Sequence, residues 1–383
     1  MPGLRNISRF VLPFTLMLAL CGRGSAEVNH ADNSGKACHE NGGEALYGFA
    51  ISNLNLSETA TIDPCTGGFS SWSSGPVPFF ANSFAVATTA GFMYISNSFI
   101  NGGFGGSQIF VYSIDPANGA ITQIPGSPFF SFPPPVSIQG LATTPDGKYL
   151  YGADVSGNLF AFSLDETTGV PTSLPGSPFA SGPNVQLVVD PSGKFLYATN
   201  VDATGSVSAF GIDSAGMPSP LPGSPFIIAS PTAAVFNTAP YGIADTGHFV
   251  YVALNGTNQI AAFSVDSATG ALTLVPGSPF LAGNAPALFA IANNFLYVVN
   301  QLDGTVSGYS MNPGNGSLTP VPGSPFGTDA VTLAIDSSGQ YLYLGTYKGV
   351  QGYNINSATG GLTPGLGKLG EAGALWLTVV GKR

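Results

Sequence analysis

Charge is scarce in this chain. Only 8 % of its 383 residues are charged, against about 25 % in an ordinary soluble domain. There are 10 Lys and Arg residues against 20 Asp and Glu residues, and the only arginine after residue 26 is Arg383. A surface with this balance repels phosphate backbones and anionic lipid headgroups, so nucleic acid is excluded as a partner.

Histidine and cysteine are also rare, with three of each. His30 and His39 lie in polar sequence near the N-terminus, and His248 occupies a turn position that holds lysine or glutamine in other repeats. A Ser-His-Asp triad therefore has no supporting context. None of these residues has metal-site spacing, so we expect no metal and no cofactor. A helical fold is excluded too, because 52 Gly and 31 Pro residues would interrupt the helices.

The first 26 residues are typical of a signal peptide. Arg5 and Arg9 precede an apolar run over residues 10–20, which is too short to span a bilayer, and small residues precede Glu27. We therefore expect export to the periplasm, the cell surface or the medium. An alternative is a lipid anchor at Cys21, because the sequence around it resembles a bacterial lipobox. No later run is long enough for a transmembrane span.

Two further cysteines, Cys38 and Cys65, follow this segment. In an exported protein they most simply form a disulfide, and two buried thiols are the alternative. We expect residues 1–26 to be the signal peptide, residues 27–44 an N-terminal tail, and residues 45–383 a single domain.

Internal repeats dominate that domain. The string Pro-Gly-Ser-Pro-Phe occurs five times, ending at Phe129, Phe179, Phe226, Phe280 and Phe326. An aromatic-rich segment with a central tyrosine occurs seven times, at Tyr47, Tyr94, Tyr151, Tyr197, Tyr251, Tyr297 and Tyr343. An Asp or Asn is followed three or four residues later by Gly at Asp63/Gly67, Asp115/Gly119, Asp165/Gly169, Asp213/Gly216, Asp266/Gly270, Asn312/Gly316 and Asn356/Gly360.

Each repeat predicts four short strands, which we call a to d. Strand b carries the tyrosine, and the Asp/Asn–Gly pair forms the turn between strands c and d. The Pro-Gly-Ser-Pro string ends strand d, and its Phe should wedge between neighbouring repeats. Four strands per repeat predict an all-β, seven-bladed β-propeller. The apolar segment 374–380 should act as strand a of the N-terminal blade and so close the ring.

The sequence resembles a known family at several of these segments. They are Phe195-Leu-Tyr-Ala-Thr-Asn200, Phe295-Leu-Tyr-Val-Val-Asn300, the turns 145–148 and 191–194, and residues 263–270. They are similar to the seven-bladed lactonase-type propellers, which include bacterial 6-phosphogluconolactonase-like proteins, and to the exported YVTN-repeat propellers. The resemblance implies lactone hydrolysis in some members. A phosphorylated substrate is disfavoured here, because the domain lacks the interior arginines that would hold a phosphate.

Candidate binding residues fall in the b–c and d–a loops, which should gather on one face of the propeller. They are Asp154, Asp202, Asp303, Asp329 and Lys348. Asp202 and Asp303 are also the candidates for an acid and a base. The alternative is a solvated acidic rim with no binding role. Lys148 and Lys194 lie in a–b turns on the opposite face.

These observations predict an exported acidic propeller that binds a ligand or protein at the cell envelope. The alternative is a hydrolase that opens a neutral lactone, which rests on the family resemblance alone. The partner is a small molecule or an envelope protein that the sequence does not identify, and we expect a monomer.

Overall fold

A computed structural model gives the fold. It describes residues 29–31, 37–39, 44–49, 57–63, 66–68, 73–75, 83–89, 91–98, 107–115, 119–132, 136–201, 205–228, 240–369 and 376–381. These residues form strands and turns, and none of them is helical, so the predicted all-β class is confirmed. Residues 1–26 with Cys21, and also Cys65 and Asp202, lie outside the described residues.

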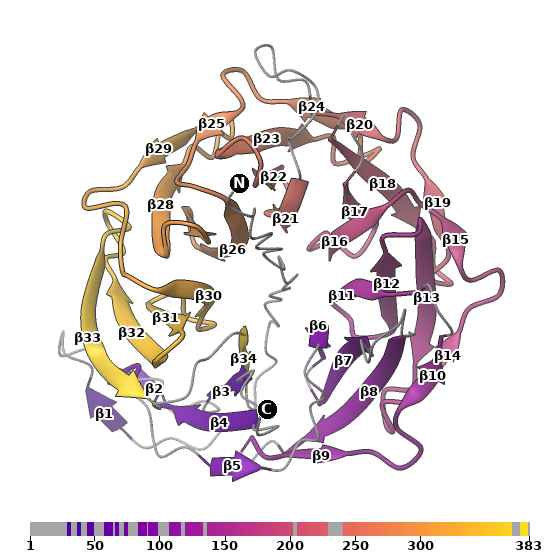
Figure 1. Ribbon diagram of the computed structural model, residues 1–383, viewed down its shortest axis with the longest axis horizontal. Helices are drawn as coiled ribbons and strands as arrows, with labels where there is room; N and C mark the ends of the chain where they lie inside the picture. Colours follow the sequence, from indigo (N-terminus) through magenta and orange to yellow (C-terminus); the bar gives the residue numbers. More distant parts are fainter. Residues whose placement is uncertain are drawn as a thin grey trace, which may run out of the picture.

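The described strands make seven sheets of four or five strands, which follow one another around a common centre as in a β-propeller (Figure 1). Sheet 1 contains β34 (Trp376–Gly381), β3 (Glu44–Phe49), β4 (Ser57–Ile62) and β5 (Ser73–Gly75). Sheet 2 contains β6 (Ser83–Thr88), β7 (Phe92–Ser98), β8 (Ser107–Ile114), β9 (Ile121–Gln123) and β10 (Phe129–Ser131). Sheet 3 contains β11 (Ile138–Thr143), β12 (Tyr149–Asp154), β13 (Asn158–Leu164), β14 (Pro171–Ser173) and β15 (Phe179–Ala180).

The remaining sheets repeat this plan. Sheet 4 contains β16 (Asn184–Val189), β17 (Phe195–Asn200), β18 (Ser206–Ile212), β19 (Pro218–Pro220) and β20 (Phe226–Ile227). Sheet 5 contains β21 (Pro240–Asp245), β22 (Phe249–Leu254), β23 (Gln259–Val265), β24 (Leu272–Leu274) and β25 (Phe280–Leu281). Sheet 6 contains β26 (Pro286–Ala292), β27 (Phe295–Asn300), β28 (Thr305–Met311) and β29 (Leu318–Pro320). Sheet 7 contains β30 (Ala330–Ile335), β31 (Tyr341–Thr346), β32 (Gly349–Ile355) and β33 (Leu362–Leu369). A separate pair, β1 (Asn29–Ala31) and β2 (Ala37–His39), lies in the segment expected to be a tail.

The two faces of the propeller differ in which connections they carry. Neighbouring strands in each sheet are antiparallel, as in sheet 3. The a–b and c–d turns therefore lie on one face, which we call the turn face. The b–c and d–a connections lie on the other, which we call the loop face. The first strands, β6, β11, β16, β21, β26, β30 and β34, contact one another in this order near the centre.

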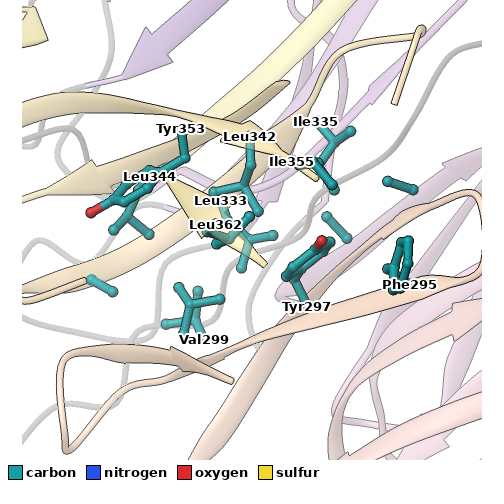
Figure 2. Close-up of a cluster of buried hydrophobic side chains, with 14 of the residues drawn as sticks. Phe295, Tyr297, Val299, Leu333, Ile335, Leu342, Leu344, Tyr353, Ile355 and Leu362 are labelled. Atoms are coloured by element: carbon teal, nitrogen blue, oxygen red, sulfur yellow. The ribbon is translucent and has the colours of Figure 1, made fainter. Parts of the chain in front are cut away.

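Apolar side chains fill the space between neighbouring sheets. In one cluster, Tyr297 and Val299 of sheet 6 pack with Leu333, Leu342 and Tyr353 of sheet 7 (Figure 2). Phe326, which ends a Pro-Gly-Ser-Pro-Phe string, packs against this cluster. The other four such phenylalanines pack in the same way in clusters that combine two consecutive sheets. The predicted wedge role of this residue is confirmed.

The repeated tyrosine explains why the c–d turn repeats with it. Its hydroxyl donates a hydrogen bond to the carbonyl of the turn glycine in the next sheet. The pairs, with O···O distances, are Tyr94–Gly169 (3.1 Å), Tyr151–Gly216 (2.8 Å), Tyr197–Gly270 (3.0 Å), Tyr251–Gly316 (3.1 Å), Tyr297–Gly360 (2.7 Å) and Tyr343–Gly67 (3.2 Å). All six glycines have a positive φ, as the turn prediction requires. The last pair joins sheet 7 to sheet 1.

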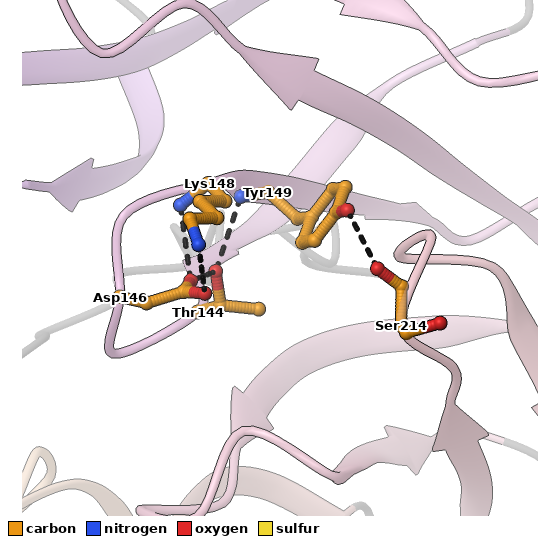
Figure 3. A network of polar contacts seen from close by, with 5 residues as sticks. All are labelled: Thr144, Asp146, Lys148, Tyr149 and Ser214. Atoms are coloured by element: carbon orange, nitrogen blue, oxygen red, sulfur yellow. Dashed lines mark hydrogen bonds and ion pairs between the residues drawn. The ribbon is translucent and has the colours of Figure 1, made fainter.

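The aromatic residue two positions before the tyrosine also reaches the next sheet. In sheet 3 the Tyr149 hydroxyl donates to the Ser214 carbonyl oxygen at 3.2 Å (Figure 3). At the start of the same strand, Asp146 accepts from Thr144 Oγ1 at 2.6 Å and lies 3.7 Å from Lys148 Nζ. Lys148 thus occupies an a–b turn, as predicted.

In sheet 1 the C-terminal strand lies beside the N-terminal one. The register pairs β34 with β3 antiparallel along all six residues of each, from Glu44 opposite Gly381 to Phe49 opposite Trp376.

Candidate functional site

A chain of hydrogen-bonded polar side chains crosses the loop face from sheet 5 to sheet 6. Asn258, in the b–c turn of sheet 5, donates from Nδ2 to Asn284 Oδ1 at 2.8 Å. Asn284, in the d–a loop before β26, donates from its backbone N to Asp303 Oδ2 at 2.7 Å and from Nδ2 to Asp303 Oδ1 at 2.6 Å. Both carboxylate oxygens of Asp303 therefore accept a hydrogen bond, and three loops are held together.

The next loops continue this row into sheet 7. Gly304, beside Asp303, accepts at its carbonyl a hydrogen bond from the Ala330 N–H at 2.8 Å. The preceding residue, Asp329, accepts from Lys348 Nζ at 2.9 Å. Both side chains of this ion pair are exposed, by 50 % for Asp329 and 70 % for Lys348. The pair neutralises the local charge but adds little stability at such exposure.

Three backbone positions of this row lie in the left-handed region. Ala285 has φ 53° and Asp329 has φ 61°, and each residue immediately precedes strand a of its sheet. Asn258 also has a positive φ, of 58°. A left-handed conformation is costly for alanine, and residues held in this way concentrate at binding sites.

Asp154 occupies a different environment. It ends β12 and is fully buried. Its carboxylate accepts hydrogen bonds from the backbone N of Ser156 at 3.0 Å, from the backbone N of Asn158 at 2.8 Å, and from Asn158 Nδ2 at 2.9 Å. The side chain therefore closes its own b–c turn.

Of the five predicted binding residues, the structure links Asp329 directly to Lys348 and places Asp303 beside the Gly304–Ala330 contact. Asp154 lies in sheet 3, and Asp202 lies outside the described residues. Asn258 was missed in the sequence, although an Asn at a tight b–c turn is a signal for a left-handed residue.

The strands nearest the centre are irregular where they begin, at the loop face. The first strands of sheets 2 to 7 each have a register shift close to their first residue. Such bulges re-aim side chains and are frequent near binding sites. The described side chains at these bulges include Gln139, Tyr241, Leu288 and Val331, of which the last three are buried.

Side chains suited to acid–base chemistry lie mostly on the turn face. His248 is exposed in the a–b turn of sheet 5, as predicted, and its backbone N donates to Thr246 Oγ1 at 3.4 Å. Lys194 is in the a–b turn of sheet 4. Among the described residues, no three His, Cys, Asp or Glu side chains gather in a way that could hold a metal ion. In the same part of the chain, no helix has the length and hydropathy to cross a membrane.

Comparison with known proteins supports the family resemblance. Residues 229–332 match the family model described as lactonase, 7-bladed β-propeller. No curated protein sequence matches the chain. The structure is similar to a 6-phosphogluconolactonase-like protein of Bacteroides uniformis, with 20 % identity, a TM-score of 0.70, and coverage of 88 % of this chain and 99 % of that one. It is also similar to the periplasmic gluconolactonase of Pseudomonas aeruginosa, with 16 % identity, a TM-score of 0.69, and coverage of 89 % and 99 %.

At these identities the structural neighbours establish the fold. Together with the match over residues 229–332, which includes sheets 5 and 6, they confirm the resemblance to the lactonase-type β-propeller family.

Proposed function

We propose that the protein binds a small uncharged ligand on its loop face. The observation that carries this proposal is the chain Asn258–Asn284–Asp303, which fixes amide and carboxylate groups on that face beside the exposed apolar side chain of Leu302. Fixed polar groups beside apolar surface are typical of sites for neutral, hydroxyl-bearing molecules. A phosphorylated ligand is disfavoured, because the Lys348 ammonium is paired with Asp329.

The second candidate function is hydrolysis of a neutral lactone. It is favoured by the similarity to a protein named as a periplasmic gluconolactonase. In this reaction a carboxylate such as Asp303 or Asp202 would accept a proton from water as the water oxygen attacks the lactone carbonyl carbon. The ring C–O bond would then break, and the ring oxygen would take up a proton to give the hydroxy acid.

One experiment tests both candidates. Purified protein beginning at Glu27 is titrated with a panel of neutral and acidic sugar lactones and their ring-opened acids, with binding followed by calorimetry and acid release by pH-stat. The Asp303→Asn variant should weaken binding roughly tenfold, because one carboxylate oxygen that accepts from Asn284 becomes a donor. Asp213→Asn, in a c–d turn of the opposite face, is the matched control and should bind normally.

The outcomes separate the candidates. Binding of neutral compounds without acid release supports the binding function. Acid release that is lost in Asp303→Asn or Asp202→Asn, with the fold intact, supports the hydrolase. Tight binding of a phosphorylated lactone by the wild type would contradict both.

We also propose that the ring has seven blades and is closed by β34. Two contacts support this, namely the pairing of β34 with β3 and the hydrogen bond from Tyr343 to Gly67. Export through a signal peptide over residues 1–26, with a Cys38–Cys65 disulfide, is proposed from the sequence. The periplasmic source of one structural neighbour is consistent with it. Lipidation at Cys21 is the alternative form of export.

A further inference from the structure

Large apolar side chains are exposed on one face of the propeller. Among the described residues they are Val155, Val201, Ile227, Leu281, Leu302 and Tyr347. Each lies in a b–c loop or in the segment between strands d and a, and therefore on the loop face. The turn face has no such side chain among the described residues. Scattered exposed apolar residues are normal in soluble proteins, but confinement to one face is not expected by chance.

The three most exposed of these side chains belong to one sector. Leu281 is 79 % exposed, and Leu302 and Tyr347 are each 67 % exposed. We call these three residues the apolar patch. They flank the polar row described above, since Leu302 donates from its backbone N to the Asn284 carbonyl at 3.3 Å. Tyr347 immediately precedes Lys348, whose ammonium is bound to Asp329.

The backbone that carries the patch is fixed. The Leu281 carbonyl accepts from the Tyr309 hydroxyl at 2.8 Å, and Leu281 pairs in register with Gln259 of β23. The Lys348 N–H donates to Thr346 Oγ1 at 3.0 Å, which holds the tip that presents Tyr347. A preorganised surface loses little entropy when it binds, and Tyr and Leu supply large contact areas.

Charge identifies the occupant of this patch. The turn face holds most of the described ionisable groups, in the a–b and c–d turns, including Asp146, Asp165, Glu166, Asp190, Asp213, Asp245, Asp266 and Asp336. A basic partner would be attracted there and not to the patch. Beside the patch the Asp329–Lys348 pair is neutral. Among the described residues, Asp303 lies in the same loop as Leu302, and Lys368 pairs with Gln351 near the start of β32, so the charges of this sector nearly balance. Two copies of this acidic chain, with formal net charge −10, can approach through this sector with the least repulsion.

We infer that a second copy of this chain docks on the apolar patch through a twofold axis. A twofold contact places the same residues on both sides, so the patch is buried against itself. It also brings the Lys348 of each copy to a surface that carries Asp303, which allows opposite charges to meet across the interface. This assembly goes beyond the proposed function, because it requires no ligand and no turnover, and it differs from the monomer expected from the sequence.

Sedimentation velocity on protein beginning at Glu27 tests the inference, over about 1 to 100 µM. The wild type should reach a dimer within this range. Leu302→Ser and Tyr347→Ser should each raise the dimer dissociation constant roughly tenfold or more. Lys348→Glu, at a side chain that is 70 % exposed and thus unlinked to folding, should also weaken the dimer.

The matched controls are Val155→Ser and Val201→Ser, which remove apolar side chains from the loop face outside the patch. They should leave the dissociation constant unchanged. A wild type that stays monomeric at the highest concentration would overturn the inference. So would a dimer that survives the combined Leu302→Ser and Tyr347→Ser change, or one that is lost in the controls. None of these results depends on whether a lactone binds.

Discussion

The turn face and the loop face of this propeller are built by different rules. On the turn face the same contact recurs between one sheet and the next: a strand-b tyrosine donates to a c–d turn glycine, six times among the described residues. On the loop face, many contacts are individual. Asn258 binds Asn284 in one place and Lys348 binds Asp329 in another, and sheet 3 closes its b–c turn with the buried Asp154 instead.

This difference distinguishes the residues that build the fold from those that could recognise a ligand or a partner. A contact that every sheet needs to bind its neighbour has to appear in every repeat, so its residues recur in the sequence. A ligand or a partner meets only part of the ring, so the residues that recognise it need not recur. On the loop face, Ala285 and Asp329 have positive φ, and Leu281, Leu302 and Tyr347 are exposed; none of these features recurs in every repeat, and loops of this kind are where binding is expected.

The largest loss of stability is expected at a c–d turn glycine, because the repeated contact between sheets depends on it. Gly270 has φ +72°, and a Cβ placed there would overlap the side chains of Phe195 and Leu221. Gly270→Ala should lower the free energy of unfolding by roughly 3–5 kcal/mol, from backbone strain and overpacking together. Chemical denaturation measures this change.

The control for that prediction is Gly91→Ala. A Cβ at Gly91 would meet no atom within 4 Å, and its φ is not positive. The variant should have a midpoint of unfolding close to that of the wild type. If both variants lost stability equally, the tight contact at Gly270 would not be the cause.

The a–b turns of the turn face differ in length, and the turns of sheets 4 and 5 show what such a difference does to a buried carboxylate. In sheet 4, Asp190 Oδ1 accepts from the Phe195 N–H at 2.7 Å, and Oδ2 accepts from the Ser192 N–H at 3.0 Å. The turn of sheet 5 is one residue shorter. There the Gly247 N–H binds Asp245 Oδ1 at 2.6 Å, while Oδ2 is buried with no partner among the described residues. Burial, and to a lesser extent the charge of Asp190, raises the pKa of Asp245 to about 7.

This raised pKa makes stability depend on pH. The folded protein keeps the proton on Asp245 up to about pH 7, whereas the unfolded chain releases it near 3.8. The resulting stabilisation is complete below the unfolded pKa and is lost as pH rises through the folded one. Asp245→Asn, which carries no charge at any pH, should raise the free energy of unfolding at pH 8 by about 2–3 kcal/mol.

The measurement is denaturant unfolding between pH 4 and pH 8, with Asp190→Asn as the matched variant. Asp190→Asn should lower stability at pH 8 by roughly 1–3 kcal/mol, because it disturbs satisfied hydrogen bonds. An Asp245→Asn protein that is less stable than the wild type at pH 8 would show that the carboxylate has a partner.

The contrast between recurring and single contacts also explains how much could be predicted from the sequence. The Tyr strand, the Asp/Asn–Gly turn and the Phe of Pro-Gly-Ser-Pro-Phe recur, so their spacing was enough to predict a propeller and the place of each residue in it. Asn258 and Asn284 occur once in their loops, and nothing in composition or spacing indicates that their side chains meet. Exposure of Leu281 or Tyr347 is likewise a tertiary property, because the same residue types fill the core elsewhere.

On the loop face, glycine should be the more stable residue at one position that now holds alanine. Ala285 adopts φ 53°, although its backbone N–H is held by Asn258 Oδ1 at 2.9 Å. Ala285→Gly removes the clash that makes this conformation costly for an L-residue, by about 1–2 kcal/mol, and adds flexibility to the unfolded chain, by about 0.4–1 kcal/mol. The net result should be a gain of about 0.5–1 kcal/mol in the free energy of unfolding.

The exposed Ala268 of a c–d turn has no positive φ, so Ala268→Gly should instead lower the free energy of unfolding by a few tenths of a kcal/mol. If Ala285→Gly also weakened ligand binding, the strained backbone would be part of the site, because the substitution leaves every polar group of the row in place.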